Sequence, residues 1–172
     1  MKLRFPESDM PYWAGRYAYT GKEAKLEGLR NTVRMAGHLT KPQLQLLATW
    51  KSPRSAPHIG GNSPRYVREV TSFALSAQDE RARIEALTVL DGVHWPTATV
   101  VLHFFHADRY PILDFRALWS VRREVPAQYT FNVWQPYVEF CRLLARRNSV
   151  SMRELDKALW QFSKEKQPKN EA

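Results

Sequence analysis

One carboxylate, Asp114, stands where it could do chemistry. It follows the segment 110–113 and precedes an apolar pattern that runs to Val121, so it can cap the N-terminus of a helix. Upstream, Gly92 lies in a predicted turn before another helix start, where consecutive backbone N–H groups can bind an anion. The stretch 86–121 therefore combines an anion-binding turn with an acid, and the rest of the chain is expected to position the two.

Other reactive side chains are sparse. His103 and His106 have a spacing that metal sites can use, and Asp108 follows them, but no further ligand is evident. We therefore interpret both histidines as packed or surface residues and expect no metal. The only cysteine, Cys141, can form no internal disulfide and cannot hold an iron–sulfur cluster. Its apolar neighbours predict a small buried side chain rather than a nucleophile, and we expect no cofactor.

The composition describes a basic, foldable chain. Hydrophobic residues make up 44% of its 172 residues, which argues against disorder, and the formal net charge is +9. This charge favours nucleic acid or an anionic membrane surface as a partner, with a merely soluble basic protein as the alternative. The N-terminus has no apolar signal core and no apolar run approaches the ~18 residues of a membrane span, so a cytoplasmic location is expected, nucleoid-associated in a bacterium. Basic residues that could track phosphates, or simply be solvated, are Lys51, Arg54, Arg142, Arg146 and Arg147.

Apolar spacing and capping signals predict a helical chain. Residues 1–21 are aromatic and turn-rich, a poor helix pattern, and are expected to wrap the domain. One helix is predicted over 22–36, and Thr40 with Gln43 forms a capping box for the next. Residues 51–63 hold enough proline, glycine and serine to predict a loop without regular structure. Further helix starts are expected at Ser63, Asp79, Asp114, Thr130 and Ser151.

Several finer predictions accompany these helices. Arg83 is expected on the charged, solvated face of the helix after Asp79. Pro136 is tolerable only in the first turn of the helix after Thr130. Six residues after Pro96 are strand formers by propensity: Thr97, Thr99, Val100, Val101, Phe104 and Phe105. The apolar run is continuous, however, and it follows a proline at a helix start, which favours a buried central helix.

Two short motifs carry a resemblance to a known family. The segments LDGVHWPTA (residues 90–98) and YPILD (residues 110–114) resemble the helix-hairpin-helix DNA glycosylase superfamily, which includes endonuclease III and the adenine glycosylases. In that family a hairpin L-P-G-[VI]-G-x-x-T-A precedes a helix, and a loop then delivers an aspartate just before the next helix. The adenine glycosylase branch has F-P-I-L-D in this loop. The family's lysine position falls on Pro96, and its aspartate falls on Asp114.

The resemblance implies an all-α, compact helical bundle of the helix-hairpin-helix glycosylase type. The expected divisions are an aromatic N-terminal arm, a helical domain that contains the hairpin and the Asp loop, and a polar tail. The arm covers residues 1–21, the helical domain 22–163 and the tail 164–172. Within the helical domain the hairpin covers 90–97 and the Asp loop covers 108–114.

The implied activity is that of a monofunctional DNA glycosylase. Such an enzyme takes a modified or mismatched base out of the duplex and hydrolyses its N-glycosidic bond, while Asp114 stabilises the positive charge that develops on the sugar. Pro96 replaces the lysine that forms a Schiff base in bifunctional relatives, so no lyase activity is expected. His94 replaces the second hairpin glycine, where a positive φ would strain a histidine.

The same resemblance nominates a site. Gly92, His94 and Thr97 are expected to contact DNA together with the arginines of 142–147. The expected pocket comprises Trp95, Arg116, Trp119, Lys51 and Arg54. Trp95 could stack on a base or simply pack, and Arg116 could hold a phosphate or be a solvent-exposed helix residue.

Rival interpretations keep the helices and change the function. One is a non-catalytic DNA-binding module that retains the scaffold, and another is a protein-interaction domain. On the leading interpretation the chain is a monomer that binds duplex DNA carrying a damaged or mismatched base, with no membrane partner.

Overall fold

The computed structural model describes residues 1–168 and is helical, without a strand in that part of the chain. This confirms the all-α prediction. The chain divides into two compact units: unit 1 comprises Met1–Ala18 and Arg109–Ala172, and unit 2 comprises Tyr19–Asp108. The predicted polar tail begins as the last turn of a helix, and its residues 169–172 lie outside the described residues.

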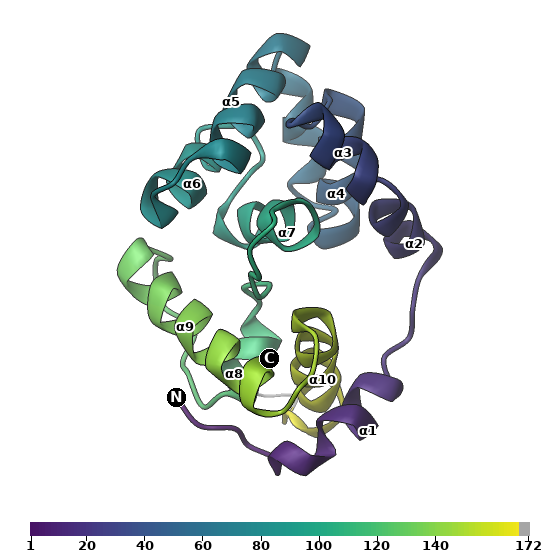
Figure 1. The fold of residues 1–172 in the computed structure, drawn as a ribbon, viewed down its shortest axis with the longest axis vertical. Coiled ribbons are helices and arrows are strands. Elements are labelled where there is room, and N and C mark those ends of the chain that lie inside the picture. The colour runs from purple at the N-terminus through teal and green to yellow at the C-terminus, as the bar shows by residue number, and fades with distance from the viewer. Residues whose placement is uncertain (169–172) are drawn as a thin grey trace. The chain divides into compact units, whose positions relative to one another are not determined.

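Unit 2 is built around one apolar helix, α7 (Trp95–Phe105). This helix packs against α3, α4 and α6 (Figure 1). All of its residues from Thr97 to Phe105 are buried except His103, so the continuous apolar run is a buried helix, as predicted. The elements around α7 are α2 (Gly21–Gly28), α3 (Arg30–Ala36), α4 (Lys41–Lys51), the 3₁₀ helix η2 (Ala56–Gly61), α5 (Pro64–Ser76) and α6 (Glu80–Leu87).

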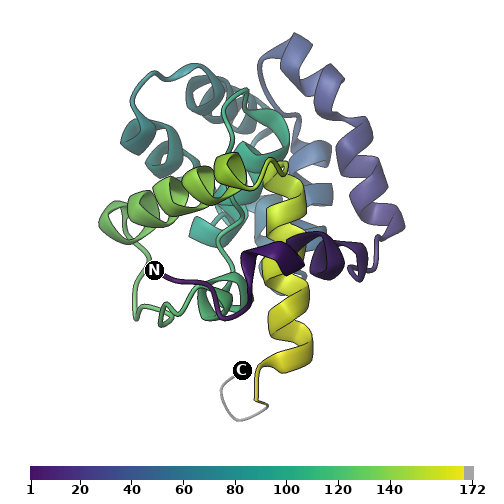
Figure 2. The ribbon, with the colours of Figure 1, turned by 60° about the horizontal axis from the view of Figure 1, so that its bottom comes forward.

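Unit 1 joins the beginning of the chain to its last third. It contains the 3₁₀ helix η1 (Glu7–Asp9), α1 (Met10–Gly15), α8 (Phe115–Ser120), α9 (Phe131–Arg147) and α10 (Met152–Lys166). The helix α10 packs against α1, α8 and α9. Figure 2 shows α1, in purple, lying across α10, in yellow.

The helix α1 corrects the expectation that the N-terminal arm lacks helix. Pro11 occupies the first turn of α1, where its missing N–H costs nothing. Met10 and Trp13 are buried, and the ring of Trp13 meets that of Phe162 edge-on at 5.2 Å. Packing against α10 thus outweighs the poor local pattern. The ring of Tyr12 remains exposed.

Two further segments differ from the sequence predictions. The helix expected over 22–36 is broken at Leu29, which ends α2 and precedes α3. The neighbouring Gly28 is a weak helix former, which favours a break at this point. The loop expected over 51–63 contains η2, because Pro57 can begin a short 3₁₀ turn and Ile59 is buried.

Two side chains also differ from expectation. Arg83 is buried rather than solvated, because it donates to the carbonyl oxygen of Ala77 and pairs with Asp108 at 2.9 Å. Pro136 lies beyond the first turn of α9. The carbonyl that it leaves without an N–H partner belongs to Asn132, four residues earlier, and both residues are exposed to water.

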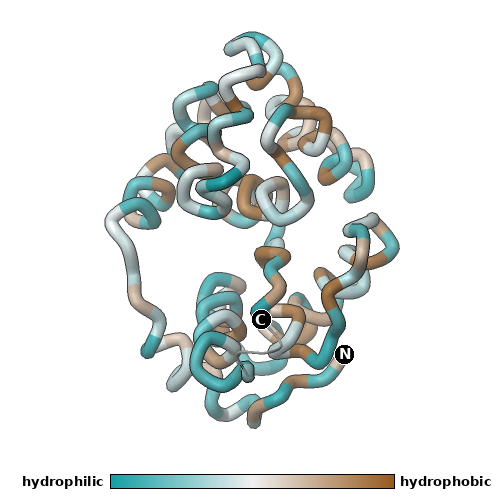
Figure 3. The backbone as a smooth tube through the Cα atoms, turned by 180° about the vertical axis from the view of Figure 1, so that it is seen from behind, coloured by the Kyte–Doolittle hydropathy of each residue, from teal (hydrophilic) through white to brown (hydrophobic). Residues whose placement is uncertain are grey.

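The predicted caps at the helix starts are largely confirmed. Thr40 and Ser151 each form a complete capping box, and Ser63, Asp79 and Asp114 accept backbone N–H bonds. Thr130 occupies its cap position without a side-chain bond. Figure 3 shows hydrophobic and hydrophilic residues interspersed along the helices, as amphipathic packing requires.

Candidate functional site

The turn before α7 is left-handed at one residue. Gly92 has φ +77°, and a Cβ atom built there would lie 2.8 Å from the carbonyl oxygen of Ser55 and 3.0 Å from the nitrogen of Ile59. Only glycine satisfies both the conformation and the close approach. The buried Val93 closes the turn by donating to the carbonyl oxygen of Leu90 at 3.0 Å.

His94 is the N-cap residue of α7 and has φ −96°, which is ordinary extended backbone. The strain expected from a histidine at the family's second glycine position is therefore absent, since the left-handed residue is Gly92 alone within this hairpin. Within residues 1–168 the backbone N–H groups of Gly92, His94 and Thr97 donate to no protein acceptor. They remain available to an anion at the start of α7.

Asn62 connects this hairpin to η2. Its side-chain oxygen accepts from the N–H of Asp91 at 3.0 Å, and its nitrogen donates to the carbonyl oxygens of Asp91 and Ile59 at 3.0 and 3.1 Å. The side chain is buried, so these bonds hold the turn to its neighbour. Beside them lies a pocket of about 660 Å³, lined by Pro57, His58, Gly61, Asp91, Gly92 and His94.

Asp114 lies in unit 1, at the start of α8. Its Oδ1 atom accepts a hydrogen bond from the N–H of Arg116 at 2.9 Å, so it is the N-cap residue that the sequence predicted. The residue is only half-buried, and water can therefore reach it. A half-buried carboxylate fixed at a helix start can stabilise a cation or activate a water molecule.

The helix α9 holds the segment that leads to Asp114. The hydroxyl of Tyr137 donates to the carbonyl oxygen of Ile112 at 3.0 Å, and Trp134 stacks on Tyr110 at 5.6 Å. Arg142 donates from Nε to the carbonyl oxygen of Arg109 at 2.9 Å and lies over the ring of Tyr110. The segment that precedes Asp114 is thus anchored in the core of unit 1.

Tyr129 is a residue that the charge of Asp114 influences, and no sequence pattern pointed to it. Burial raises the pKa of Tyr129, and the negative charge of Asp114 raises it further. The phenol therefore stays neutral at physiological pH and keeps its O–H donor. No motif indicated this residue, because it lies fifteen positions after Asp114 along the sequence.

The two predicted pocket residues of unit 1 have different surroundings. Arg116 is half-buried, with its guanidinium 4.9 Å from the ring centre of Phe115 and 5.7 Å from that of Trp160. Trp119 stacks on Phe162 at 5.7 Å, and the guanidinium of Arg4 lies 4.3 Å from its ring centre. Trp119 therefore packs within unit 1, whereas Arg116 remains close to the surface.

The predicted residues of unit 2 differ in how far they are exposed. Trp95 is the first residue of α7 and is half-buried, while the side chain of Thr97 is buried. Lys51 ends α4 and is half-buried, and Arg54 is exposed in the turn that precedes η2.

The arginines of α9 are engaged to different degrees. Arg142 holds the backbone of Arg109, as described above. Arg147 pairs with Glu7, whose side chain also accepts from Asn148, and these two contacts hold the pKa of Glu7 below its ordinary value. Arg146 is exposed and has no charged partner within the described residues.

The two histidines and the cysteine that the sequence offered as reactive groups contact neighbouring residues or are buried. The ring nitrogen Nδ1 of His106 accepts from the N–H of Asp108 at 2.9 Å, and His103 meets Phe104 edge-on. Within residues 1–168 no three His, Cys, Asp or Glu side chains gather as metal ligands would. Cys141 is buried, as predicted, and burial raises the pKa of its thiol far above the usual range, which disfavours a nucleophile.

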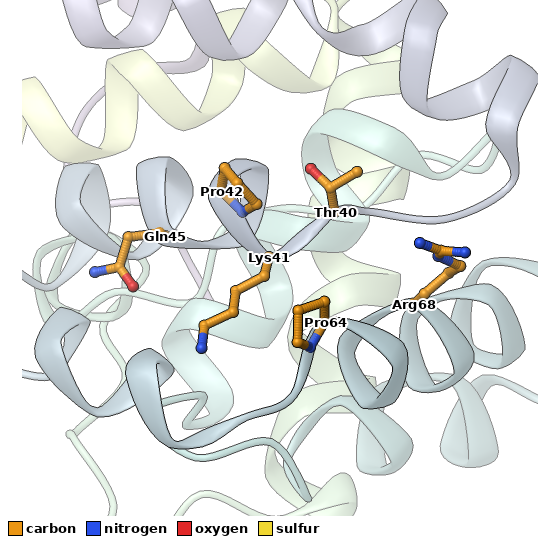
Figure 4. A pocket seen from close by; sticks show the side chains of 6 residues that line it. All are labelled: Thr40, Lys41, Pro42, Gln45, Pro64 and Arg68. Atoms are coloured by element: carbon orange, nitrogen blue, oxygen red, sulfur yellow. The ribbon is translucent and has the colours of Figure 1, made fainter.

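A second pocket of unit 2, of about 460 Å³, lies between the first turns of α4 and α5. Figure 4 shows Gln45 and Arg68 near its opposite ends, with Pro42 and Pro64 between them. Lys41 donates to the carbonyl oxygen of Gly60 at 2.8 Å, so its ammonium group ties α4 to η2. Sequence patterns gave no sign of this pocket, since its walls come from separate helices.

None of the helices within residues 1–168 combines the length and hydrophobicity of a membrane span. Comparison of the chain with protein-family models, with curated proteins and with solved structures finds no match.

Proposed function

We propose that this protein is a monofunctional DNA-glycosylase-like enzyme with a fold of the helix-hairpin-helix glycosylase type. It flips a modified or mismatched base of duplex DNA and hydrolyses the N-glycosidic bond. The observation that carries the proposal is Asp114: a half-buried carboxylate at a helix start, at the end of a segment that α9 holds in place. The order of the motifs along the chain, hairpin then helix then aspartate, also supports the proposal, because it is the order found in the family that the motifs resemble.

In the proposed reaction Asp114 stabilises the oxocarbenium-like sugar as the bond to the base breaks. Water then adds to the sugar, the base leaves with a proton, and an abasic site remains. Pro96 occupies the position of the Schiff-base lysine, so the abasic strand stays intact.

The hairpin supplies the proposed hold on the DNA backbone. The N–H groups of Gly92, His94 and Thr97 lie at the N-terminal end of α7, where the helix dipole also favours a negative charge. A phosphate bound there positions the duplex without reading any base. His94 adopts its observed conformation without a left-handed φ, so the histidine is compatible with this role.

The test is a cleavage assay on synthetic duplexes, each with one deaminated, oxidised, alkylated or mismatched base. Strand breaks are expected on one or more duplexes, and only after hot alkali opens the abasic sites. Asp114→Asn should lower the rate at least about 100-fold, as loss of a group that acts on the transition state does. Asparagine caps helices as well as aspartate does, so the fold should be retained.

Asp79→Asn is the matched control. Asp79 is also an N-cap residue: it caps α6 by accepting from the N–H of Ala82 at 2.8 Å, whereas Asp114 caps α8 by accepting from the N–H of Arg116. The Asp79→Asn variant should cut like the parent. The proposal fails if no duplex is cut, or if Asp114→Asn cuts as fast as the parent protein.

A second candidate is a DNA-binding module without catalysis. The cap bond from Arg116 to Asp114 favours it, because that structural role alone would account for an aspartate here. This candidate predicts salt-dependent DNA binding that survives Asp114→Asn and no cleavage of any duplex. Under either candidate the proposed partner is DNA, the chain acts as a monomer, and a cytoplasmic location would follow, nucleoid-associated in a bacterium.

A further inference from the structure

A basic and aromatic surface follows one side of α10. Arg153, Lys157, Trp160 and Lys164 are spaced four, three and four residues apart, so they share one face of the helix. Tyr17 and Arg116 adjoin this face. These residues of unit 1 are called the α10 patch.

Trp160 is the centre of the α10 patch. The ammonium of Lys164 lies 5.0 Å from its ring centre, the guanidinium of Arg116 lies 5.7 Å away, and Tyr17 meets it edge-on at 5.3 Å. The rings of Tyr17 and Trp160 therefore hold cationic side chains at defined places on the surface. Cations held in this way lose less conformational freedom when they bind a partner.

The cations of the patch differ in how far their charge is already balanced. Arg153 pairs with Asp156, which is buried, so its charge is balanced locally. Arg116 and Lys164 form no ion pair with any carboxylate within residues 1–168. These two side chains carry the net positive charge that a polyanion would meet.

We propose that the α10 patch binds the phosphate backbone of the DNA strand, as a contact separate from the hairpin. From Arg153 to Lys164 the helix rises roughly 16 Å, at about 1.5 Å per residue. A DNA strand advances about 3.4 Å per phosphate, so the patch spans roughly five nucleotides. A surface that combines cations with aromatic rings matches a nucleic-acid strand better than it matches a purely acidic peptide.

The position of Arg116 connects the patch with the proposed chemistry, and this step rests on the proposed function. The N–H of Arg116 donates to Asp114, while its guanidinium belongs to the patch. A phosphate bound to this guanidinium would be close in the strand to the sugar on which Asp114 acts. The α10 patch thus would place the strand that carries the flipped base.

The experiment measures binding of the full chain to a fluorescein-labelled 25-base-pair duplex by anisotropy at several NaCl concentrations. Arg116→Gln with Lys164→Gln should weaken binding about 10-fold at 0.1 M salt. It should also reduce the slope of log K against log salt by roughly 1.8, because each phosphate that a cation neutralises contributes about 0.9 to the slope. The control is Lys22→Gln with Lys25→Gln, exposed residues of α2, which removes the same charge.

The control pair should change binding less than about 2-fold, as expected of solvent-exposed charges that do not belong to the α10 patch and are screened by salt. Equal weakening by the two pairs would overturn the proposal, because net charge alone would then explain the effect. The proposal would also be overturned if Arg116→Gln with Lys164→Gln weakened the binding of poly-glutamate by the same factor as the binding of DNA. Far-UV circular dichroism verifies that each variant is folded.

Trp160→Leu provides an independent variant, since it removes the aromatic ring and keeps all charges. It should weaken duplex binding several-fold, and unchanged binding would contradict the role of the ring. Cleavage assays separate the two proposals. If Asp114→Asn abolishes cutting while the double variant Arg116→Gln with Lys164→Gln leaves the salt slope unchanged, only the proposal for the patch is wrong. If the double variant changes the salt slope but the parent protein cuts no duplex, only the proposed enzyme activity is rejected.

Discussion

The hydroxyl group of Tyr137 donates a hydrogen bond to the carbonyl oxygen of Ile112 at 3.0 Å, two residues before Asp114. Both partners are buried, so neither can turn to water instead. The bond fixes the backbone of the segment 110–113 against α9. The geometry of Asp114 therefore depends on a side chain more than twenty residues further along the chain.

Tyr137→Phe should destabilise the protein. The ring still fills its site, but the carbonyl of Ile112 loses its partner in a dry environment, which costs about 1–3 kcal/mol. Thermal denaturation should show a melting temperature lower by roughly 2–4 °C for each kcal/mol of destabilisation. Tyr66→Phe is the control, because Tyr66 is exposed, and it should melt with the parent. Coincident melting curves for Tyr137→Phe and Tyr66→Phe would show that the buried bond contributes nothing.

Gly92→Ala should disrupt the hairpin. The left-handed φ costs a residue with a Cβ about 1–3 kcal/mol, and the added atom would also meet the carbonyl of Ser55 at 2.8 Å. Urea denaturation should report the destabilisation, and duplex binding should weaken with it. Gly28→Ala at the end of α2, where the added atom meets nothing, should be neutral or stabilising by up to about 1 kcal/mol. Equal effects of the two substitutions would refute the conformational argument.

His94→Gly introduces the residue that the helix-hairpin-helix glycosylases, which the motif resembles, have at this position, yet it should not stabilise the protein. His94 has φ −96°, so glycine relieves no strain there. Glycine instead increases the freedom of the unfolded chain, which should lower the free energy of unfolding by about 0.5–1 kcal/mol. Urea denaturation measures this change. A more stable variant would mean that the hairpin is strained at His94 after all.

Local signals predicted the parts of the site that depend on local structure. The cap at Asp114 followed from an aspartate before an apolar pattern, and the helix α7 followed from Pro96 and a continuous apolar run. The caps at Thr40 and Ser151 were predictable for the same reason, since a capping box is complete within four residues.

Contacts between distant segments were not predictable in this way. Arg83 is buried because Asp108, twenty-five residues away, pairs with it, and the helical pattern around Arg83 contains no trace of that partner. The helix α1 forms because Trp13 packs on α10, nearly 150 residues later in the chain. Tyr129 and the α10 patch were not predicted for the same reason, since the residues that interact with them come from other parts of the chain.

Glu7→Gln should remove a pH-dependent contribution to stability. The contacts of Glu7 with Asn148 and Arg147 hold its pKa below the ordinary value of 4.5 in the folded protein. A carboxylate whose pKa is depressed by folding stabilises the protein above its unfolded pKa, and this contribution disappears as the pH falls through the folded pKa. The parent should therefore be more stable than Glu7→Gln at pH 7, and the difference should shrink below about pH 4.5.

Urea denaturation at pH 7, 4 and 3 measures that difference for Glu7→Gln. Glu139→Gln serves as the control, on the helix α9 that also carries Arg147, because Glu139 is exposed and has no ion pair within residues 1–168. The gap between parent and control should stay small and constant across the three pH values. A gap between parent and Glu7→Gln that is equally constant would show that the contact between η1 and the end of α9 does not depend on the charge of Glu7.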